Sequence, residues 1–175
     1  SILGDHQLYN ISTSIAASRK IFNIKDDYIK NGIKNISLKA RLEEIKSGKL
    51  KDIAGNNKLV IDGGHNISAS LSIANWIKNQ NEEANLIVGM MKDKEHVEFI
   101  KAFENIVNSI TLIDIPNQDG AISKEDFKKK LDNSKLNLKL SNGIEESIKS
   151  LSKNENTIIL CVGSLYLAGE ILSLN

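Results

Sequence analysis

The 175-residue sequence lacks features that mark several large classes of protein. It has a single cysteine, Cys161, within an apolar run, so we expect a core thiol, no internal disulfide and a cytoplasmic protein. Its apolar runs are far too short to cross a bilayer, and no signal-peptide pattern opens the chain. The formal net charge is only +1. We therefore expect neither a membrane nor a nucleic acid as the main partner.

The composition that remains is that of a folded globular protein, with 41% hydrophobic and 26% charged residues. The length suffices for one domain, or for one domain with part of another. The chain does not begin with Met, and residues of helical character start almost at once. We expect a fragment of a longer protein.

From residue 58 onward, short apolar runs alternate with amphipathic segments. Four proline-free runs rich in Ile, Leu and Val predict strands at 58–62, 85–90, 109–115 and 156–163. Helical spacing of apolar residues predicts helices at 67–77, 97–107, 123–132, 142–152 and 165–174. Asn66 is placed to cap the first of these helices. Strands alternating with helices predict an α/β fold, with a mainly parallel sheet covered on both faces.

Residues 1–36 differ from the rest of the chain. Their spacing predicts two helices with no strand between them, the second at 26–35. Residues 41–62 then suggest two strands around a polar, glycine-containing connection. The lysine-rich run 124–139 has interspersed acids, and we interpret it as a solvated helix face. We place a domain boundary near residues 36–38.

The segment LVIDGGHN puts polar residues where a predicted strand meets a helix. Ligands of open parallel sheets bind there, beyond the carboxyl ends of the strands. Gly63 and Gly64 permit tight backbone geometry and close approach of a ligand. Asp62 can accept hydrogen bonds from ribose hydroxyls, and His65 can donate to a phosphate or a carboxylate. The same residues also suit a simple helix start, with His65 at the surface.

A second polar group lies near the start of the first predicted helix. His6 and Gln7 sit near its positive end, and Asn10 lies one turn further on, so all three can face one site. The Asn10 amide carries the paired donor and acceptor that match the edge of adenine. A polar helix start without a ligand is the alternative.

Three more segments carry candidate anion-binding groups. Arg41 has the planar fork that binds phosphate oxygens, unless it forms a surface salt bridge with a nearby Glu. Lys92 and Lys94 follow the second predicted strand of the sheet, in a loop that can hold a carboxylate or be plain solvent-exposed chain. Ser164 follows the last strand, where it can bind an anion or serve as an N-cap.

Taken in order, the segments GDHQLYN, ARLEEI, DGGHN, VGMMKDKE and GSLYLAGE closely resemble the folylpolyglutamate synthase/dihydrofolate synthase family of the Mur ligase superfamily. The resemblance covers essentially the whole chain, but only the latter part of the family's length. It implies that residues 1–36 are the helical tail of a central ATP-binding domain. Residues 37–175 would be the C-terminal, Rossmann-like, glutamate-binding domain.

The resemblance also implies an activity. Such enzymes are ATP-dependent ligases that add L-glutamate to dihydropteroate, to reduced folates or to both, through an acyl phosphate, with ATP and Mg²⁺ as cofactors. Members of the superfamily commonly work as monomers. The alternatives are a fragment of a peptidoglycan Mur ligase, which should lack the Gly-Ser-Leu-Tyr element, and a non-catalytic Rossmann-like module that binds a nucleotide or an anion.

For the nucleotide, the resemblance implies that Asn10 contacts the adenine, with His6 and Gln7 supporting that region. Arg41 would contact the phosphates, and Asp62 the ribose.

For the second substrate, the resemblance implies that His65 and Ser164 bind the incoming glutamate and act as the catalytic residues. Lys94 would lie near the carboxylate of the glutamate, with Lys92 as the second choice.

The sequence departs from the family pattern at two places and omits one motif. Leu38-Lys39 replaces a Trp-Pro pair, which removes rigidity from the linker, and Ile67 replaces a proline after the His-Asn pair. No GxxxxGK[ST] phosphate loop occurs in these residues. The magnesium ligands would also lie upstream, so we expect no metal ligand here. The chain alone should be inactive.

Overall fold

The computed structural model describes residues 5–36, 38–131 and 136–175, with the backbone alone for residues 5–7. The strands are β1 (Glu43–Ile45), β2 (Lys58–Ile61), β3 (Ala84–Val88), β4 (Ser109–Leu112), β5 (Leu138–Leu140) and β6 (Ile158–Val162). The helices are α1 (Asp5–Ile21), α2 (Asp26–Asn35), α3 (Lys49–Ala54), α4 (Ile67–Lys78), α5 (His96–Lys101), α6 (Lys124–Lys130), α7 (Ile144–Leu151) and α8 (Leu165–Leu174). Within these described ranges, no helix combines the length and apolar character needed to span a membrane.

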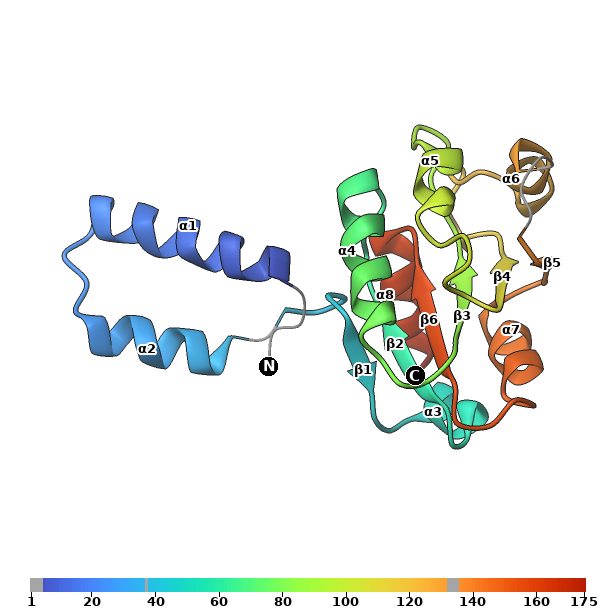
Figure 1. Cartoon of the computed structure of the whole chain (residues 1–175), viewed down its shortest axis with the longest axis horizontal. Coiled ribbons are helices and arrows are strands. Elements are labelled where there is room, and N and C mark those ends of the chain that lie inside the picture. Colours follow the sequence, from blue (N-terminus) through green and yellow to red (C-terminus); the bar gives the residue numbers. More distant parts are fainter. Residues whose placement is uncertain (1–4, 37, 132–135) are drawn as a thin grey trace.

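The strands form one six-stranded sheet in the order β1-β2-β6-β3-β4-β5. Only β1 runs antiparallel, against β2, and the other pairs are parallel. The last strand, β6, inserts between β2 and β3, so loops from distant parts of the chain meet at the carboxyl ends of these three strands (Figure 1). The predicted mainly parallel sheet is confirmed.

Helices cover both faces of the sheet, as predicted. One apolar cluster joins β-strand side chains to α4, α5 and α6, with Ile73, Phe99 and Phe127 as buried members. The other joins the opposite side chains to α3, α7 and α8. Cys161 lies in this second cluster, and burial raises the pKa of its thiol to about 12. It is a core thiol, because a thiol held neutral at physiological pH is a poor nucleophile.

The helices α1 and α2 form a pair beside the sheet, with no strand between them (Figure 1). This confirms the two helices expected within residues 1–36. Several large apolar side chains of the two helices and their connection are exposed to solvent, including Leu8, Tyr9, Phe22 and Tyr28.

Two elements of the structure, α3 and β5, were not predicted from the sequence. The connection between β1 and β2 contains the short helix α3, bounded by Gly48 and Gly55, which both have positive φ. The lysine-rich run forms α6 only as far as Lys130, and its end forms the edge strand β5. The helix expected at 97–107 is also shorter, since α5 ends at Lys101.

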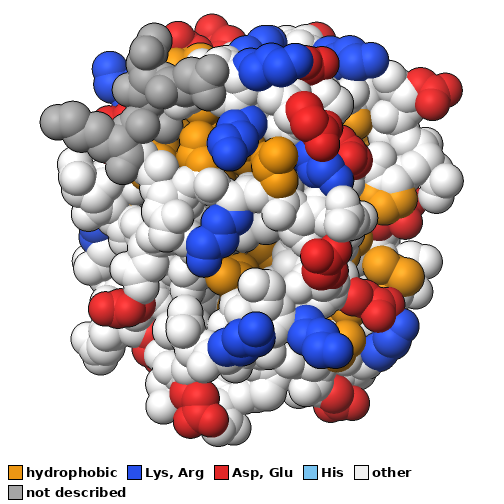
Figure 2. Space-filling model, turned by 90° about the vertical axis from the view of Figure 1, so that its right-hand side faces the viewer, with side chains coloured by type: hydrophobic (Ala, Val, Ile, Leu, Met, Phe, Trp, Pro, Cys, Tyr) orange, Lys and Arg blue, Asp and Glu red, His pale blue; other side chains and the backbone are white. Residues whose placement is uncertain are grey.

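Figure 2 shows the face of the molecule on which α6, β5 and α7 lie. Lys and Arg side chains stand among Asp and Glu side chains over this face, rather than forming a patch of one sign. The ion pair between Lys129 and Asp126, at 2.9 Å on α6, is one example of this mixing. The α6 part of the lysine-rich run is thus a solvated helix face, as predicted.

Candidate functional site

Three loops at the carboxyl ends of β2, β3 and β6 form the centre of the candidate site. They comprise residues 62–66, 89–95 and 163–164. Main-chain hydrogen bonds join them: Asp62 N–H donates to Cys161 O at 2.9 Å, and Gly163 N–H donates to Gly64 O at 3.0 Å. The loops lead to helices on opposite faces, α4 and α5 on one and α8 on the other. Such a change of face at neighbouring strand ends is where open parallel sheets bind ligands.

Close packing explains most of the glycines in these loops. A Cβ on Gly63 would lie 2.2 Å from Leu165 Cδ2, and one on Gly64 would lie 2.7 Å from the nearest side chain. Neither residue has a positive φ, so an unusual dihedral angle is not needed, and the close neighbours are side chains of the protein itself. Gly163 does have a positive φ, of 107°, and a Cβ there would lie 2.7 Å from Gly89 O.

Asn66 caps α4, as its position in the sequence predicts. Its side-chain oxygen accepts a hydrogen bond from Ala69 N–H at 2.9 Å. This cap forms although Ile67 stands where the family has proline. The helix therefore begins at the expected residue without help from a proline.

His65, Lys94 and Ser164 come together around one cavity of about 300 Å³. The residues that line it come from all three loops and from the start of α8: His65, Met91, Asp93, Lys94, Gly163, Ser164, Leu165 and Tyr166. Lys92 is not among them, and its Nζ donates to Asp119 O at 2.9 Å instead. Of the two lysines of this loop, only Lys94 faces the cavity.

A cation and an anion lie side by side in this cavity. Lys94 Nζ is 2.8 Å from the Asp93 carboxylate. The hydrogen bond from Lys94 lowers the pKa of Asp93, and the positive charge of Lys94 lowers it further. Sequence reasoning passed over Asp93, although its place between two lysines was a signal. The pair suits a small ligand that carries both charges, such as an amino acid.

Two further cavity residues, His65 and Ser164, have defined partners. His65 Nδ1 lies 2.9 Å from Gly63 O, so Nδ1 carries the proton in the neutral ring and Nε2 keeps a lone pair. Ser164 is buried, and its Oγ accepts a hydrogen bond from Tyr166 N–H at 3.1 Å. Ser164 is thus the N-cap of α8 and also lines the cavity.

A larger cavity of about 840 Å³ lies between the α1–α2 pair and α4. Asn10, Arg41 and Asp62 line it, together with many isoleucine side chains from α1 and α2. The structure thus brings together three of the five residues expected at a nucleotide. The other two, His6 and Gln7, have their backbone in α1, but their side chains lie outside the described residues.

Arg41 lines this cavity, and no carboxylate among the described residues pairs with it. The nearby Glu43 is bonded to Lys39 Nζ at 2.9 Å and to Ala40 N–H at 2.8 Å. Among the described residues, Arg41 forms no ion pair, so the surface salt bridge considered for it is absent there. Its guanidinium can bind an anion in the cavity.

Asp62 is only 4% exposed, and both of its carboxylate oxygens accept main-chain hydrogen bonds. Oδ2 accepts from Leu42 N–H at 2.8 Å, and Oδ1 accepts from Gly64 N–H at 2.7 Å. The carboxylate therefore joins the segment that carries Arg41 to the loop that carries His65.

Residues 47–174 match the protein family described as "Dihydrofolate synthetase, C-terminal domain". The chain belongs to this dihydrofolate synthetase family. The match confirms the resemblance found in the sequence motifs and decides against the peptidoglycan-ligase alternative.

Individual relatives agree with the dihydrofolate synthetase match. A probable dihydrofolate synthetase of Schizosaccharomyces pombe is 22% identical, over 96% of this chain and 42% of its own length. The folylpolyglutamate synthase of Mycobacterium tuberculosis, solved with ADP and AMPPCP, has a TM-score of 0.85 at 18% identity, over 99% of this chain and 40% of its own. The bifunctional folylpolyglutamate synthase/dihydrofolate synthase of Yersinia pestis, complexed with AMPPNP and Mn ion, has a TM-score of 0.70 at 16% identity, over 86% of this chain and 34% of its own.

At these identities the solved structures show a shared fold. The chain spans about two-fifths of the length of the S. pombe and M. tuberculosis relatives. Activity and substrates of a whole dihydrofolate synthetase are therefore proposals for this chain.

His96 is a further buried polar residue near the small cavity. It is 2% exposed, with Nε2 3.0 Å from Met91 O and Nδ1 3.3 Å from Lys130 Nζ. Because a lysine ammonium only donates, Nδ1 accepts and Nε2–H donates to Met91 O. Burial lowers the pKa of His96, and the charge of Lys130 lowers it further. The bond to Met91 O joins the His96 ring to the loop that carries Lys94.

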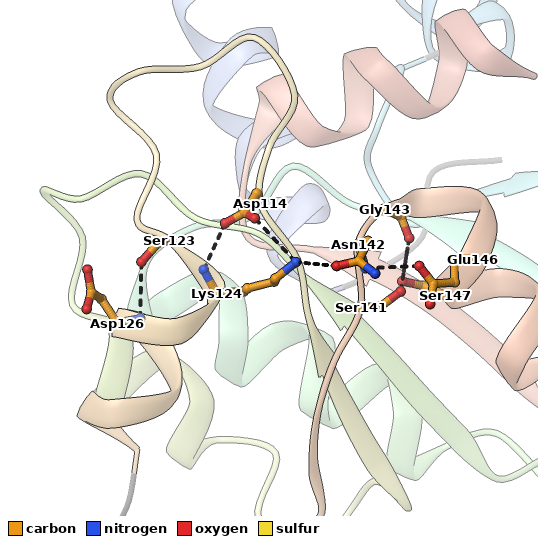
Figure 3. A network of polar contacts seen from close by, with 9 residues as sticks. All are labelled: Asp114, Ser123, Lys124, Asp126, Ser141, Asn142, Gly143, Glu146 and Ser147. Carbon is orange, nitrogen blue, oxygen red and sulfur yellow. Dashed lines mark hydrogen bonds and ion pairs between the residues drawn. The ribbon is translucent and has the colours of Figure 1, made fainter.

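Polar residues that follow β4 and β5, the two strands next to β3 at this side of the sheet, bond to one another (Figure 3). Asp114 follows β4 and accepts from Lys124 N–H at 2.9 Å, while Lys124 Nζ donates to Asn142 Oδ1 at 2.8 Å, beyond β5. Ser147 Oγ donates to Gly143 O at 2.7 Å. The polar groups on the β4–β5 side of the edge thus bond to one another, and the two cavities described above form the candidate site.

Proposed function

We propose that the chain is the glutamate-binding part of an ATP-dependent ligase that joins L-glutamate to dihydropteroate, to reduced folates or to both. The observation that carries this proposal is the small cavity at the ends of β2, β3 and β6. There His65, the neighbours Asp93 and Lys94, and Ser164 meet from three loops that are far apart in sequence. The family match supports the same class of enzyme. We expect the protein to act as a monomer in the cytoplasm.

The proposed reaction has two steps. The substrate carboxylate attacks the γ-phosphorus of ATP, which forms an acyl phosphate and releases ADP. The amine of glutamate then attacks the acyl carbon, the amide bond forms, and inorganic phosphate leaves. Negative charge builds on the transferred phosphoryl group in the first step, so cationic groups such as Arg41 stabilise it.

The small cavity supplies the groups that the second step needs. Lys94 Nζ binds a carboxylate of glutamate, and the adjacent Asp93 carboxylate attracts its ammonium. Ser164 Oγ accepts from Tyr166 N–H, so its own proton can be donated to a bound carboxylate oxygen. His65 keeps a lone pair on Nε2, which can take the proton that the attacking amine loses. His65 and Ser164 are the proposed catalytic residues.

The larger cavity is proposed to hold the nucleotide. Its polar side combines Asn10, suited to adenine, with Arg41, suited to phosphates, and with Asp62. His6 and Gln7 remain proposed supports of the adenine. The described residues contain no group of three or more His, Cys, Asp or Glu that could hold a metal, so the ligands of Mg²⁺ are proposed to lie elsewhere in the full-length protein.

Each of the two cavities is thus proposed to bind a different ligand, glutamate in the smaller one and the nucleotide in the larger one. For the amide to form, the glutamate amine and the acyl carbon must come within about 3–3.5 Å of each other. We propose that closure about residues 36–40 brings the parts together, as in other enzymes whose sites assemble between domains.

The proposal is tested by assaying the full-length protein with ATP and L-glutamate, and with dihydropteroate or tetrahydrofolate as acceptor. We expect one ADP for each amide formed, detected by mass spectrometry of the product. The 175-residue chain alone should form none, because it lacks a GxxxxGK[ST] loop. Nucleotide binding by the full-length protein without product would contradict the ligase and favour a non-catalytic binding module.

A further inference from the structure

Arg41 lies between two residues with an uncommon backbone conformation. Ala40 has a φ of 53° and Leu42 a φ of 47°, both in the left-handed region. A Cβ makes this region unfavourable, and a bulky residue such as leucine is rarely found there. Neither position is glycine, so other contacts must stabilise the turn at residues 40–42.

The loop after β2 supplies those contacts on both sides of Arg41. The Asp62 carboxylate accepts from Leu42 N–H at 2.8 Å, and Gly63 N–H donates to Ala40 O at 2.9 Å. Asp62 is itself held, because its other oxygen accepts from Gly64 N–H at 2.7 Å. A buried carboxylate that accepts main-chain N–H groups forms charge-assisted bonds, which are stronger than neutral ones.

The burial of the residues on either side of Arg41 places Arg41 at the cavity. Ala40 and Leu42 are 4% and 2% exposed, and they pack into different apolar clusters, on opposite faces of the sheet. Arg41 lies between them and lines the 840 Å³ cavity, which Asp62 also lines. The conformation of the turn therefore determines where the guanidinium of Arg41 lies.

We infer that Asp62 is a positioning residue for Arg41: by binding Leu42 N–H it stabilises the strained 40–42 turn, which presents Arg41 to the phosphates of the nucleotide. This inference rests on the proposed function of the larger cavity. It differs from the contact to ribose expected from the sequence, because the described carboxylate bonds go to the backbone.

The test uses the full-length protein and compares Asp62→Asn, Arg41→Ala and the double variant. Hydrogen exchange of the peptide spanning residues 38–44 reports on the turn, and KM and kcat are measured with ATP and with 3′-deoxyATP. Asp114→Asn is the matched control, since Asp114 also follows a strand and accepts a main-chain N–H, from Lys124 at 2.9 Å, outside the cavity. Thermal unfolding checks that each variant folds.

We expect Asp62→Asn to speed exchange of the peptide about tenfold and to raise KM for ATP by a similar factor. The rise should be equal for 3′-deoxyATP. In the Arg41→Ala background, Asp62→Asn should raise KM for ATP by less than about twofold more, because Asp62 acts on ATP binding through Arg41. Asp114→Asn should change neither quantity.

The inference is overturned if Asp62→Asn leaves the exchange unchanged, or if its effect on KM multiplies with that of Arg41→Ala and disappears with 3′-deoxyATP. That second pattern would establish a direct ribose contact. Should Asp62→Asn fail to fold, Ala40→Gly replaces it. Glycine adopts positive φ without the Cβ cost, so unchanged or slower exchange supports strain in the turn, and faster exchange contradicts it. If the wild-type protein uses no ATP, the proposed function fails, while the exchange measurements still decide whether Asp62 holds the turn.

Discussion

At the scale of single residues, several polar side chains bond to the backbone near the two cavities. Asp62, Ser164 and His96 are each at most 4% exposed, and each bonds to main-chain groups of the loops or the helix that line the cavities. Residues with such bonds keep a site in one geometry, and their loss moves the groups that meet the ligand. Lys94 and Arg41, by contrast, are cationic side chains that line the cavities.

His96 should make the stability of the protein depend on pH. Its pKa in the folded protein lies below the ordinary value of 6.5, so the unfolded state binds more protons as the pH falls through 6.5. The free energy of unfolding therefore falls on acidification through this range. We expect the wild type to lose more stability than His96→Gln between pH 7 and pH 5, measured by urea unfolding. A parallel pH dependence in the two proteins would contradict this role.

The types of the site residues could be predicted from the sequence, but most of their contacts could not. His65, Lys94 and Ser164 could be placed together because parallel strands end at one edge of a sheet. The bond from Leu42 N–H to Asp62 joins residues 20 positions apart, and the bond from Lys130 to His96 joins residues 34 apart. No local pattern signals such pairs, because they depend on tertiary packing.

At the scale of elements, the prominent strands and helices were predictable and the short ones were not. The apolar runs of β2, β3, β4 and β6 are buried on both sides, which gives a strong signal. The only sequence signal for the edge strand β5 is the alternation of Leu136, Leu138 and Leu140. This signal is weak because it directly follows a lysine-rich helix in the sequence. Helix α3 spans six residues, too few for a clear period.

The start of α3 is stabilised by a residue more than a hundred positions away. Gly48 is its N-cap and has no side chain, but Asn175 Oδ1 accepts from Leu50 N–H at 3.0 Å and from Lys51 N–H at 3.3 Å. Asn175 Nδ2 also donates to Ser47 O at 2.8 Å. Asn175 thus serves as a capping side chain from a distant part of the chain.

We expect Asn175→Ala to lower the free energy of unfolding by about 1 kcal/mol, the usual cost of losing an N-cap. Urea unfolding measures this difference. The control is Asn79→Ala, which removes one exposed hydrogen bond to Asn75 O and should change stability by less than about 0.5 kcal/mol. Equal effects of the two substitutions would show that Asn175 does not cap α3.

At the scale of the whole molecule, the sheet order explains both the position and the division of the site. Asp62, Lys94 and Ser164 follow β2, β3 and β6, which are neighbours, so they share one edge of the sheet. They do not share one cavity: Asp62 lines the larger one, while Lys94 and Ser164 line the smaller one. The common edge could be predicted from the order of strands and helices, but the separation depends on how the α1–α2 pair lies beside α4.

The central claim is that the small cavity binds glutamate through Lys94. Lys92 provides a matched control, because it lies in the same loop but donates to Asp119 O, away from the cavity. The decisive measurement is the KM for L-glutamate of the full-length protein and of its Lys94→Ala and Lys92→Ala variants. Loss of a charged hydrogen bond of about 1.5–3 kcal/mol predicts a rise in KM of roughly 10- to 150-fold for Lys94→Ala, and a change of less than about twofold for Lys92→Ala. An unchanged KM in Lys94→Ala, or equal increases in both variants, would contradict the account.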